Sequence, residues 1–210
     1  MQVYWGNAGK HSDITIIQEN GWGIMYSGNW NKKNSRLVPI ALDNGAFTSY
    51  RQNKPYDSSW FLRNIQHCID LNIVPDFIIV PDIVGAGEDS LSFSLEWMQK
   101  LCNEFPKYLA VQDGMTIDMI PCELFDGIFI GGTISWKMRM GEMWVNYAHE
   151  NNMKCHIGRV GTYERIRWAL RIGADSIDSS SWPQNNSWEK HLKRAFQDHN
   201  NNYNLMSILQ

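Results

Sequence analysis

The sequence predicts a single α/β domain over residues 1–210, folded as a compact, trimmed TIM-like (β/α)8 barrel without a zinc subdomain. Eight short β-rich runs recur along the chain, and most are separated by segments with helical periodicity. Several runs, such as "FIIV" and "IFI", are almost continuously apolar, which is typical of parallel strands covered on their outer face. Alternating strands and helices give a parallel sheet, and eight strands favour a closed barrel over an open doubly wound sheet.

Each expected strand leads into turn residues such as Gly, Asp or Asn. The expected strands are residues 2–7, 23–28, 38–45, 76–83, 108–114, 127–133, 154–160 and 175–181. Helical periodicity is found in residues 58–72, 90–105, 137–152 and 162–173. Residues 29–37 lie between two strands and have no helical pattern, so we expect the barrel to be trimmed there, with a short connection in place of a helix. The Asn-rich residues 198–204 are expected to form a tail or a solvated turn.

Charge and cysteine content exclude several classes of function. The formal net charge is -3, so no global field attracts nucleic acid and any such partner must meet a local basic patch. The basic residues of the C-terminal third are a candidate patch, with solvated helix faces as the alternative. The four cysteines lie far apart with no CxxC pair, which indicates neither a disulfide framework nor a metal site.

The chain has neither a signal-peptide pattern at its start nor a run approaching 18 apolar residues. We therefore expect a cytoplasmic protein with no membrane partner, in the host cytoplasm if a phage encodes it.

Polar residues and glycines gather where the expected strands end. In parallel α/β sheets and barrels the reactive face lies at these ends, because the loops that follow the strands converge there. The strand-end residues are Asp43, Asp82, Gln112, Asp113, Gly131, Gly132, His156, Arg159 and Asp178. Each aspartate alone is typical of a residue that closes an ordinary turn or caps the next helix. Their joint occurrence on one rim favours a functional cleft.

Two carboxylates on one rim suit chemistry at an anomeric carbon, where one attacks the carbon and the other moves a proton. Asp43 and Asp178 are the candidates for these roles. Asp175, at the start of the last expected strand, is expected to serve the turn.

The other strand-end residues each have a structural alternative. The Gly131-Gly132 pair lets backbone approach a flat ligand, or simply makes a tight turn. Gln112 can offer a donor and an acceptor to a heterocycle, or can bond to loop backbone. His156 can move a proton or bind a metal, but its apolar strand favours a hydrogen-bonded core or rim histidine. Trp182, in a loop near the rim, is a candidate for stacking on bases.

The strand-end segments resemble a known family in their order. "LDNGAF", "VPDIV", "AVQDG", "DGIFIGGT" and "HIGRVGT…RIRWALRIGADSIDSSS" are similar to the signature segments of the tRNA-guanine transglycosylase family. The resemblance runs from about residue 38 to 182 and is closer to the short phage and bacterial relatives that insert 7-deazaguanines into DNA.

The resemblance implies roles for individual residues. Asp178 matches the nucleophile that attacks C1′ of the nucleotide, and Asp43 matches the other active-site aspartate, a general acid/base. Asp82 and Gln112 match the residues that read the purine edge, and Gly131 with Gly132 matches the segment that borders the base; with His156 added, they form the predicted base-binding set. Apart from the resemblance, the basic residues and the loops near the rim predict a nucleic-acid-binding set of Lys137, Arg139, Arg159 and Trp182.

Three departures from the tRNA enzymes favour a DNA-acting relative. The chain lacks their Cys/His zinc motif, it is much shorter, and its loop "SSSWPQNN" lacks an arginine that they carry. We therefore expect exchange of guanine in DNA for a free 7-deazaguanine base, such as 7-cyano-7-deazaguanine, through a covalent aspartyl-sugar intermediate. No metal or other cofactor is expected, the target guanine is flipped out or single-stranded, and the oligomeric state is left open. The alternatives are an RNA transglycosylase, a nucleoside or glycoside hydrolase, and a noncatalytic nucleobase-binding barrel.

Overall fold

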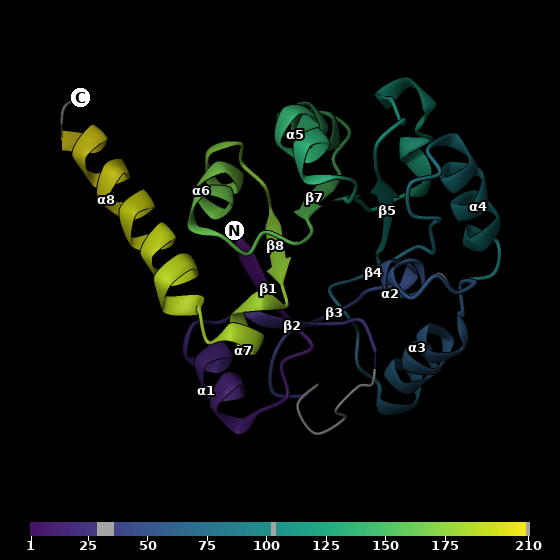
Figure 1. Ribbon diagram of the computed structural model, residues 1–210, viewed down its shortest axis with the longest axis horizontal. Coiled ribbons are helices and arrows are strands. Elements are labelled where there is room, and N and C mark those ends of the chain that lie inside the picture. The colour runs from purple at the N-terminus through teal and green to yellow at the C-terminus, as the bar shows by residue number, and fades with distance from the viewer. Residues whose placement is uncertain (29–35, 102–103, 209–210) are drawn as a thin grey trace.

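The computed structural model describes residues 1–28, 36–101 and 104–208, and the side chains as far as residue 201. Eight parallel strands follow one another around a closed barrel in sequence order (Figure 1). The strands are β1 (Gln2–Gly6), β2 (Gly23–Tyr26), β3 (Ile40–Leu42), β4 (Phe77–Ile79), β5 (Lys107–Val111), β6 (Gly127–Ile130), β7 (Lys154–Ile157) and β8 (Ser176–Ser179). The predicted (β/α)8 barrel is confirmed, and each expected strand is present in a shorter form.

The barrel closes where β8 pairs with β1, in a register that sets Asp178 opposite Tyr4. The helices are α1 (His11–Glu19), α2 (Ala46–Arg51), α3 (Ser59–Leu71), α4 (Glu88–Met98), α5 (Ile134–Glu150), α6 (Tyr163–Arg171), α7 (Ser181–Asn185) and α8 (Arg194–Ile208). Short 3-10 turns at Ile117–Met119 and Cys122–Leu124 and a π-helical turn at Glu189–Lys193 complete the elements.

Helices α3, α4, α5 and α6 match the predicted helical segments, whereas α1, α2, α7 and α8 were not predicted. The expectation of a tail or solvated turn near the C-terminus is wrong, because α8 runs through it. Ala195 is fully buried, and Tyr163 of α6 donates a hydrogen bond to Asp198 at 2.5 Å. Packing against α6 thus outweighs the weak helical propensity of asparagine. Nearly all of the predicted trimming segment, residues 29–35, lies outside the described residues.

The strand period of two sorts the side chains between two cores. Odd positions of β1, such as Val3 and Trp5, pack outward against the helices, while Tyr4 points into the barrel. The lower barrel interior is aromatic, with Phe77 and Tyr108 stacked at a centroid distance of 4.1 Å. This packed floor closes the described barrel interior below the carboxyl ends of the strands, where a cavity opens.

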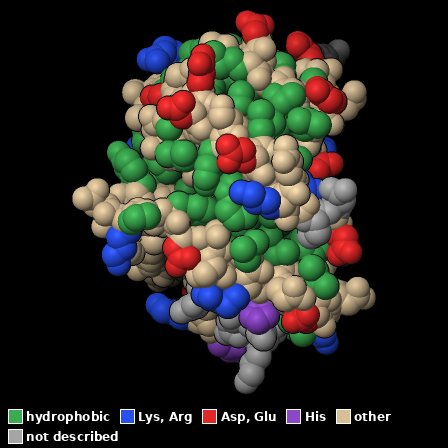
Figure 2. All heavy atoms as spheres, turned by 90° about the vertical axis from the view of Figure 1, so that its right-hand side faces the viewer, with side chains coloured by type: hydrophobic (Ala, Val, Ile, Leu, Met, Phe, Trp, Pro, Cys, Tyr) green, Lys and Arg blue, Asp and Glu red, His purple; other side chains and the backbone are tan. Residues whose placement is uncertain are grey.

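The face at the right of Figure 1 carries acidic side chains scattered among apolar ones (Figure 2). Exposed apolar side chains in or after α3 include Leu62, Ile69 and Val74. This face is therefore not a continuous basic surface. Among the described residues, no helix combines the length and the apolar character that crossing a bilayer requires.

Candidate active site

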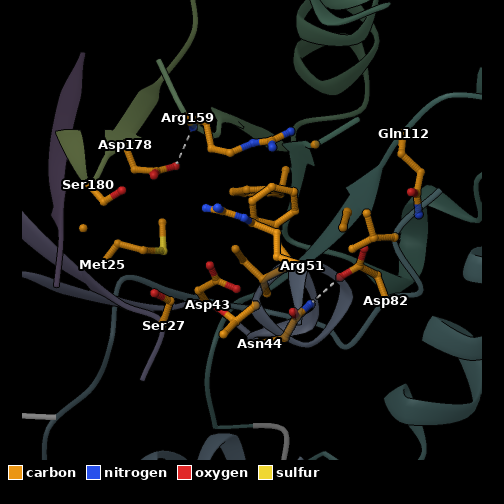
Figure 3. Close-up of a pocket in the computed structure, with 18 of the residues that line it drawn as sticks. Met25, Ser27, Asp43, Asn44, Arg51, Asp82, Gln112, Arg159, Asp178 and Ser180 are labelled. Carbon is orange, nitrogen blue, oxygen red and sulfur yellow. Dashed lines mark hydrogen bonds between the residues drawn. The ribbon is translucent and has the colours of Figure 1, made fainter. Parts of the chain in front are cut away.

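A cavity of about 490 Å³ opens at the carboxyl ends of the strands (Figure 3). Its lining includes most of the residues predicted from the strand ends. These are Asp43, Asp82, Gln112, Gly131, Gly132, Arg159 and Asp178. Residues that are far apart in the sequence thus line one pocket of the size typical of ligand sites.

Asp178 lies on β8 and points inward from its strand, with 14% of its side chain exposed. Its Oδ1 atom accepts a hydrogen bond from His156 Nε2 at 3.0 Å and another from the backbone N–H of Arg159 at 3.2 Å. No other described residue donates a hydrogen bond to this carboxylate. The Oδ2 atom is thereby left available to a ligand in the cavity.

Asp43 follows β3 and accepts a hydrogen bond from the backbone N–H of Gly45 at 2.8 Å. Burial raises its pKa to about 7, and the negative charges of Asp178 and Asp82 act in the same direction. The Gly45 hydrogen bond and the Arg159 charge offset part of this increase. Near neutral pH the carboxyl group can therefore either give or take a proton, as a general acid/base requires.

Asp82 follows β4 and is bound by Asn44, whose Nδ2 donates to Asp82 Oδ1 at 2.7 Å and to the Val80 carbonyl at 2.9 Å. Burial raises the pKa of Asp82 to about 6, against the lowering effect of the Asn44 hydrogen bond. Asn44 is buried and links the ends of β3 and β4. It was missed in the sequence, although it directly follows Asp43.

Gln112 is buried and its amide group bonds to loop backbone. Its Oε1 accepts from the N–H of Gly85, and its Nε2 donates to the Ile83 carbonyl at 2.9 Å. The loop-bonding alternative is therefore correct for Gln112, which fixes the loop after β4. A further role in reading a base stays a prediction.

The glycine pair forms the turn between β6 and α5. The N–H of Gly131 donates to the Val111 carbonyl at 2.9 Å, and Gly132 has a φ of 67°. A Cβ atom at Gly132 would lie 2.6 Å from Asp113 Oδ2. The tight-turn alternative thus accounts for Gly132, and both glycines also border the cavity.

Arg159 is half-buried and faces the cavity. Its Nη2 donates to the Gly132 carbonyl at 2.6 Å, and its guanidinium lies 4.2 Å from the centroid of the Phe47 ring. These two contacts hold the side chain against the wall of the cavity.

Three predicted contacts with substrate disagree with the structure. His156 was placed with the base-binding residues, but it is fully buried below the cavity and bonds to Asp178. Lys137 was predicted to meet phosphates, but it is buried and donates its Nζ proton to the Gly158 carbonyl. Trp182 was predicted to stack on bases, but it is fully buried near Trp5. Packing removes all three from direct contact with a ligand.

Arg139 is exposed on α5, outside the described lining of the cavity. Its predicted contact with nucleic acid remains a prediction.

The cavity is also lined by residues that the sequence did not single out, among them Arg51 and Met25. Arg51, at the end of α2, points into it, and Met25 of β2 lies between Asp178 and Asp43 (Figure 3). Arg51 was missed because α2 was not predicted.

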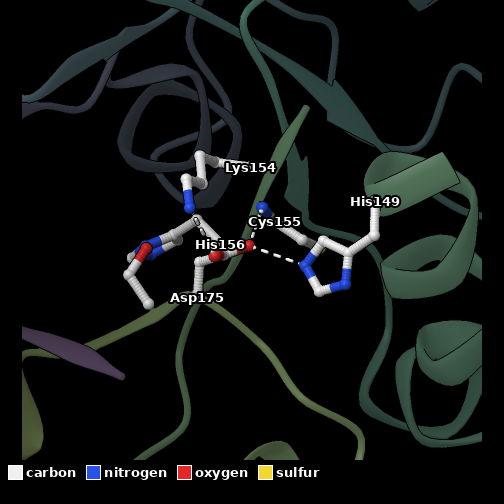
Figure 4. A network of polar contacts seen from close by, with 6 residues as sticks. His149, Lys154, Cys155, His156 and Asp175 are labelled. Atoms are coloured by element: carbon white, nitrogen blue, oxygen red, sulfur yellow. Dashed lines mark hydrogen bonds and ion pairs between the residues drawn. The ribbon is translucent and has the colours of Figure 1, made fainter. Parts of the chain in front are cut away.

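Asp175 lies just before β8 and outside the described lining of the cavity, as expected for a structural residue, and Figure 4 shows its polar contacts. It accepts hydrogen bonds from the Cys155 N–H at 2.8 Å, His149 Nε2 at 2.9 Å and Lys154 Nζ at 3.1 Å. Asp175 thus has a structural role, but its side chain joins the start of β8 to β7 and α5, and a role in the turn itself stays a prediction.

Among the described residues, no group of three His, Cys, Asp or Glu side chains is placed to hold a metal ion. No family model matches the chain, and no curated protein matches it significantly. The fold and the geometry of the cavity therefore carry the functional argument.

Proposed function

We propose that the chain is a DNA-guanine transglycosylase that exchanges guanine for a free 7-deazaguanine base through a covalent link between Asp178 and the sugar. The observation that carries this proposal is the pair of unlike carboxyl groups in one cavity. Asp178 offers a free oxygen, and Asp43 has its pKa raised to about 7. This division of roles is what nucleophilic substitution at C1′ with proton transfer needs.

In the first half of the reaction, Asp178 Oδ2 attacks C1′ and the bond from C1′ to N9 of guanine breaks. The departing base takes its electron pair with it and receives a proton from Asp43. In the second half, N9 of the incoming deazaguanine gives its proton to Asp43 and attacks C1′, which releases the Asp178 carboxylate. Two inversions give net retention at C1′.

The cavity suits a purine nucleoside in size and lining. Its volume of about 490 Å³ is within the range for small-ligand sites, and Ile79, Ala110 and Phe129 give it an apolar lining. A duplex does not fit such a cavity, so the target guanine must be flipped out or single-stranded. Asp82, ionised above its pKa of about 6, can accept hydrogen bonds from the N–H groups of a guanine edge.

The resemblance of the strand-end segments to guanine transglycosylases supports this class of substrate. The loop "SSSWPQNN", which lacks an arginine that the tRNA enzymes carry, supports DNA over tRNA as the polymer.

The proposal is tested by incubating the protein with guanine-containing single-stranded DNA and labelled 7-cyano-7-deazaguanine. We expect wild type to incorporate the label and Asp178→Asn to incorporate none. Asp113→Asn is the matched control, because Asp113 is on the same rim but is bonded to Thr133 and lies outside the described lining of the cavity.

Other outcomes would overturn the proposal. Equal incorporation by wild type and Asp178→Asn would remove Asp178 from the nucleophile's role. Release of guanine without incorporation of the second base would indicate a hydrolase, and labelling of tRNA but not of DNA would indicate an RNA enzyme.

A further inference from the structure

A chain of hydrogen bonds runs from the barrel interior to the cavity through a fully buried histidine. His156 Nδ1 lies 2.8 Å from Ser176 Oγ, and its Nε2 lies 3.0 Å from Asp178 Oδ1. His156 and Ser176 are register partners on β7 and β8, and Asp178 lies two residues further along β8. All three side chains therefore share the inner face of the barrel.

The surroundings of His156 disfavour its charged form. The imidazole stacks on Phe129 at a centroid distance of 5.2 Å, and Phe77 lies equally close. Burial lowers the pKa of His156, opposed by Asp178, while the charge of nearby Lys137 lowers it further. The ring is thus neutral at pH 7 and carries a single N–H.

The partners of the ring decide which nitrogen carries that proton. The nucleophile's role requires Asp178 as a carboxylate, which only accepts hydrogen bonds, so Nε2 carries the proton that is donated to it. Nδ1 then accepts the hydroxyl proton of Ser176. Ser176 is buried and lies outside the described lining of the cavity, so it is not a nucleophile. The group that meets a ligand is the aspartate. In a Ser-His-Asp triad the serine meets the substrate and the aspartate orients the histidine, so the order is reversed here.

The loop after β7 supplies the second donor to the same oxygen. The backbone N–H of Arg159 points at Asp178 Oδ1, and Arg159 has a φ of 58°, which is uncommon for a residue other than glycine. Lys137 binds the Gly158 carbonyl, and the Arg159 side chain binds Gly132. These contacts fix the backbone N–H beside the carboxylate.

We propose that His156 is a positioning residue for the nucleophile, an inference that rests on the proposed function. Two fixed N–H donors converge on Oδ1, so the carboxylate is held with Oδ2 toward C1′. When the bond from Oδ2 to C1′ forms and the C1′–N9 bond breaks, Oδ1 becomes the ester carbonyl oxygen and keeps both donors. When the incoming base breaks that ester, the same donors stabilise the carboxylate that leaves.

The first measurement needs no activity. ¹⁵N NMR of the histidine rings should show His156 neutral at pH 7 with the proton on Nε2, and Asp178→Asn should shift this signal. A proton on Nδ1, a doubly protonated ring or an unchanged signal would overturn the assigned contact.

The second measurement compares single-turnover formation of the DNA adduct in two variants. His156→Phe keeps an aromatic ring but removes the donor, and His156→Gln restores an N–H. We expect the Phe variant to form the adduct about 10²–10³-fold more slowly, the usual cost of losing one such donor, with an unchanged dissociation constant for DNA. The Gln variant should recover at least about tenfold of this loss, by the same donor argument.

His149→Phe is the matched control, because His149 also bonds to an aspartate, Asp175, but away from the cavity. It should leave the rate of adduct formation unchanged. A folded His156→Phe protein with the wild-type rate, or a Gln variant as slow as the Phe variant, would overturn the positioning role. A wild type that forms no adduct but has the expected imidazole signal would instead overturn the proposed function.

Discussion

Replacing Asp43 by Asn should change how the stability of the protein depends on pH. The folded state raises the pKa of Asp43 from 3.8 to about 7, mainly by burial, so folding favours its neutral form. At about 1.4 kcal/mol per pKa unit, ionising this group in the folded state costs on the order of 4 kcal/mol. Asp43 lines the cavity and is only partly buried, so solvent screening reduces this figure, and we expect a measured effect of at least about 2 kcal/mol.

The direction in which the stability changes with pH follows from proton binding. Between pH 4 and 7 the folded protein binds the Asp43 proton more tightly than the unfolded chain does, so wild-type stability falls as the pH rises through this window. Asn mimics the neutral acid and has no such loss. The variant should therefore match wild type near pH 4 and be more stable by at least about 2 kcal/mol at pH 8.

Urea unfolding followed by tryptophan fluorescence at pH 4.5, 6 and 8 measures this difference. Asp113→Asn is the control, because we expect it to change the stability at pH 8 in the opposite direction. Burial raises the pKa of Asp113, but hydrogen bonds from Thr133 outweigh it and hold the pKa below its ordinary value. Removing this carboxylate should destabilise the protein at pH 8. If the stabilities of wild type and Asp43→Asn change in parallel from pH 4.5 to 8, the folded state does not raise the pKa of Asp43.

Three further predictions concern the frame and the mouth of the cavity. Gly132→Ala forces a left-handed φ on alanine and sets its Cβ 2.6 Å from Asp113 Oδ2, so it should lower the free energy of unfolding by about 2 kcal/mol, whereas Gly9→Ala, with no atom within 4 Å, should not. An equal effect in both variants would contradict the clash. Arg51→Ala should weaken binding of single-stranded DNA and reduce the slope of log K against log salt by about 0.7, the value for one lost phosphate contact. An unchanged slope would remove Arg51 from the DNA site. Burial lowers the pKa of Lys137 to about 7, so wild type should gain stability relative to Lys137→Met as the pH rises from 7 to 10. Parallel stabilities over that range would contradict a strongly desolvated lysine.

Strand positions could be predicted from the sequence because a buried parallel strand leaves a local signal. Apolar runs that end in polar residues located β3, β4 and β8, and with them Asp43, Asp82 and Asp178. The loops after parallel strands converge whatever their sequence, so most of the residues predicted from the strand ends line the cavity.

The depth of a side chain in the barrel left no such signal. His156 and Asp178 both point inward, but Asp178 lies one inward-facing layer nearer the barrel mouth, because His156 pairs with Ser176. The layer in which each side chain lies depends on the stagger between β7 and β8, and this stagger cannot be predicted from the sequence.

Burial of Lys137 and Trp182 depends on packing between distant elements. Lys137 lies on the buried face of α5, where its long stem lets Nζ reach the Gly158 carbonyl. Trp182 is the second residue of the unpredicted helix α7 and packs near Trp5 of β1. A basic or aromatic residue near the rim is therefore a weak indication of a surface role.

The most direct test of a covalent link between Asp178 and the sugar is the mass of the peptide that carries Asp178 after a quenched reaction with DNA. Trypsin releases residues 172–190, which contain both Asp175 and Asp178, and fragmentation separates the two sites. We predict a deoxyribose adduct on Asp178 that disappears when excess 7-deazaguanine is added before quenching. An adduct on Asp175 or Asp43, or incorporation of the base without any adduct, would contradict this prediction.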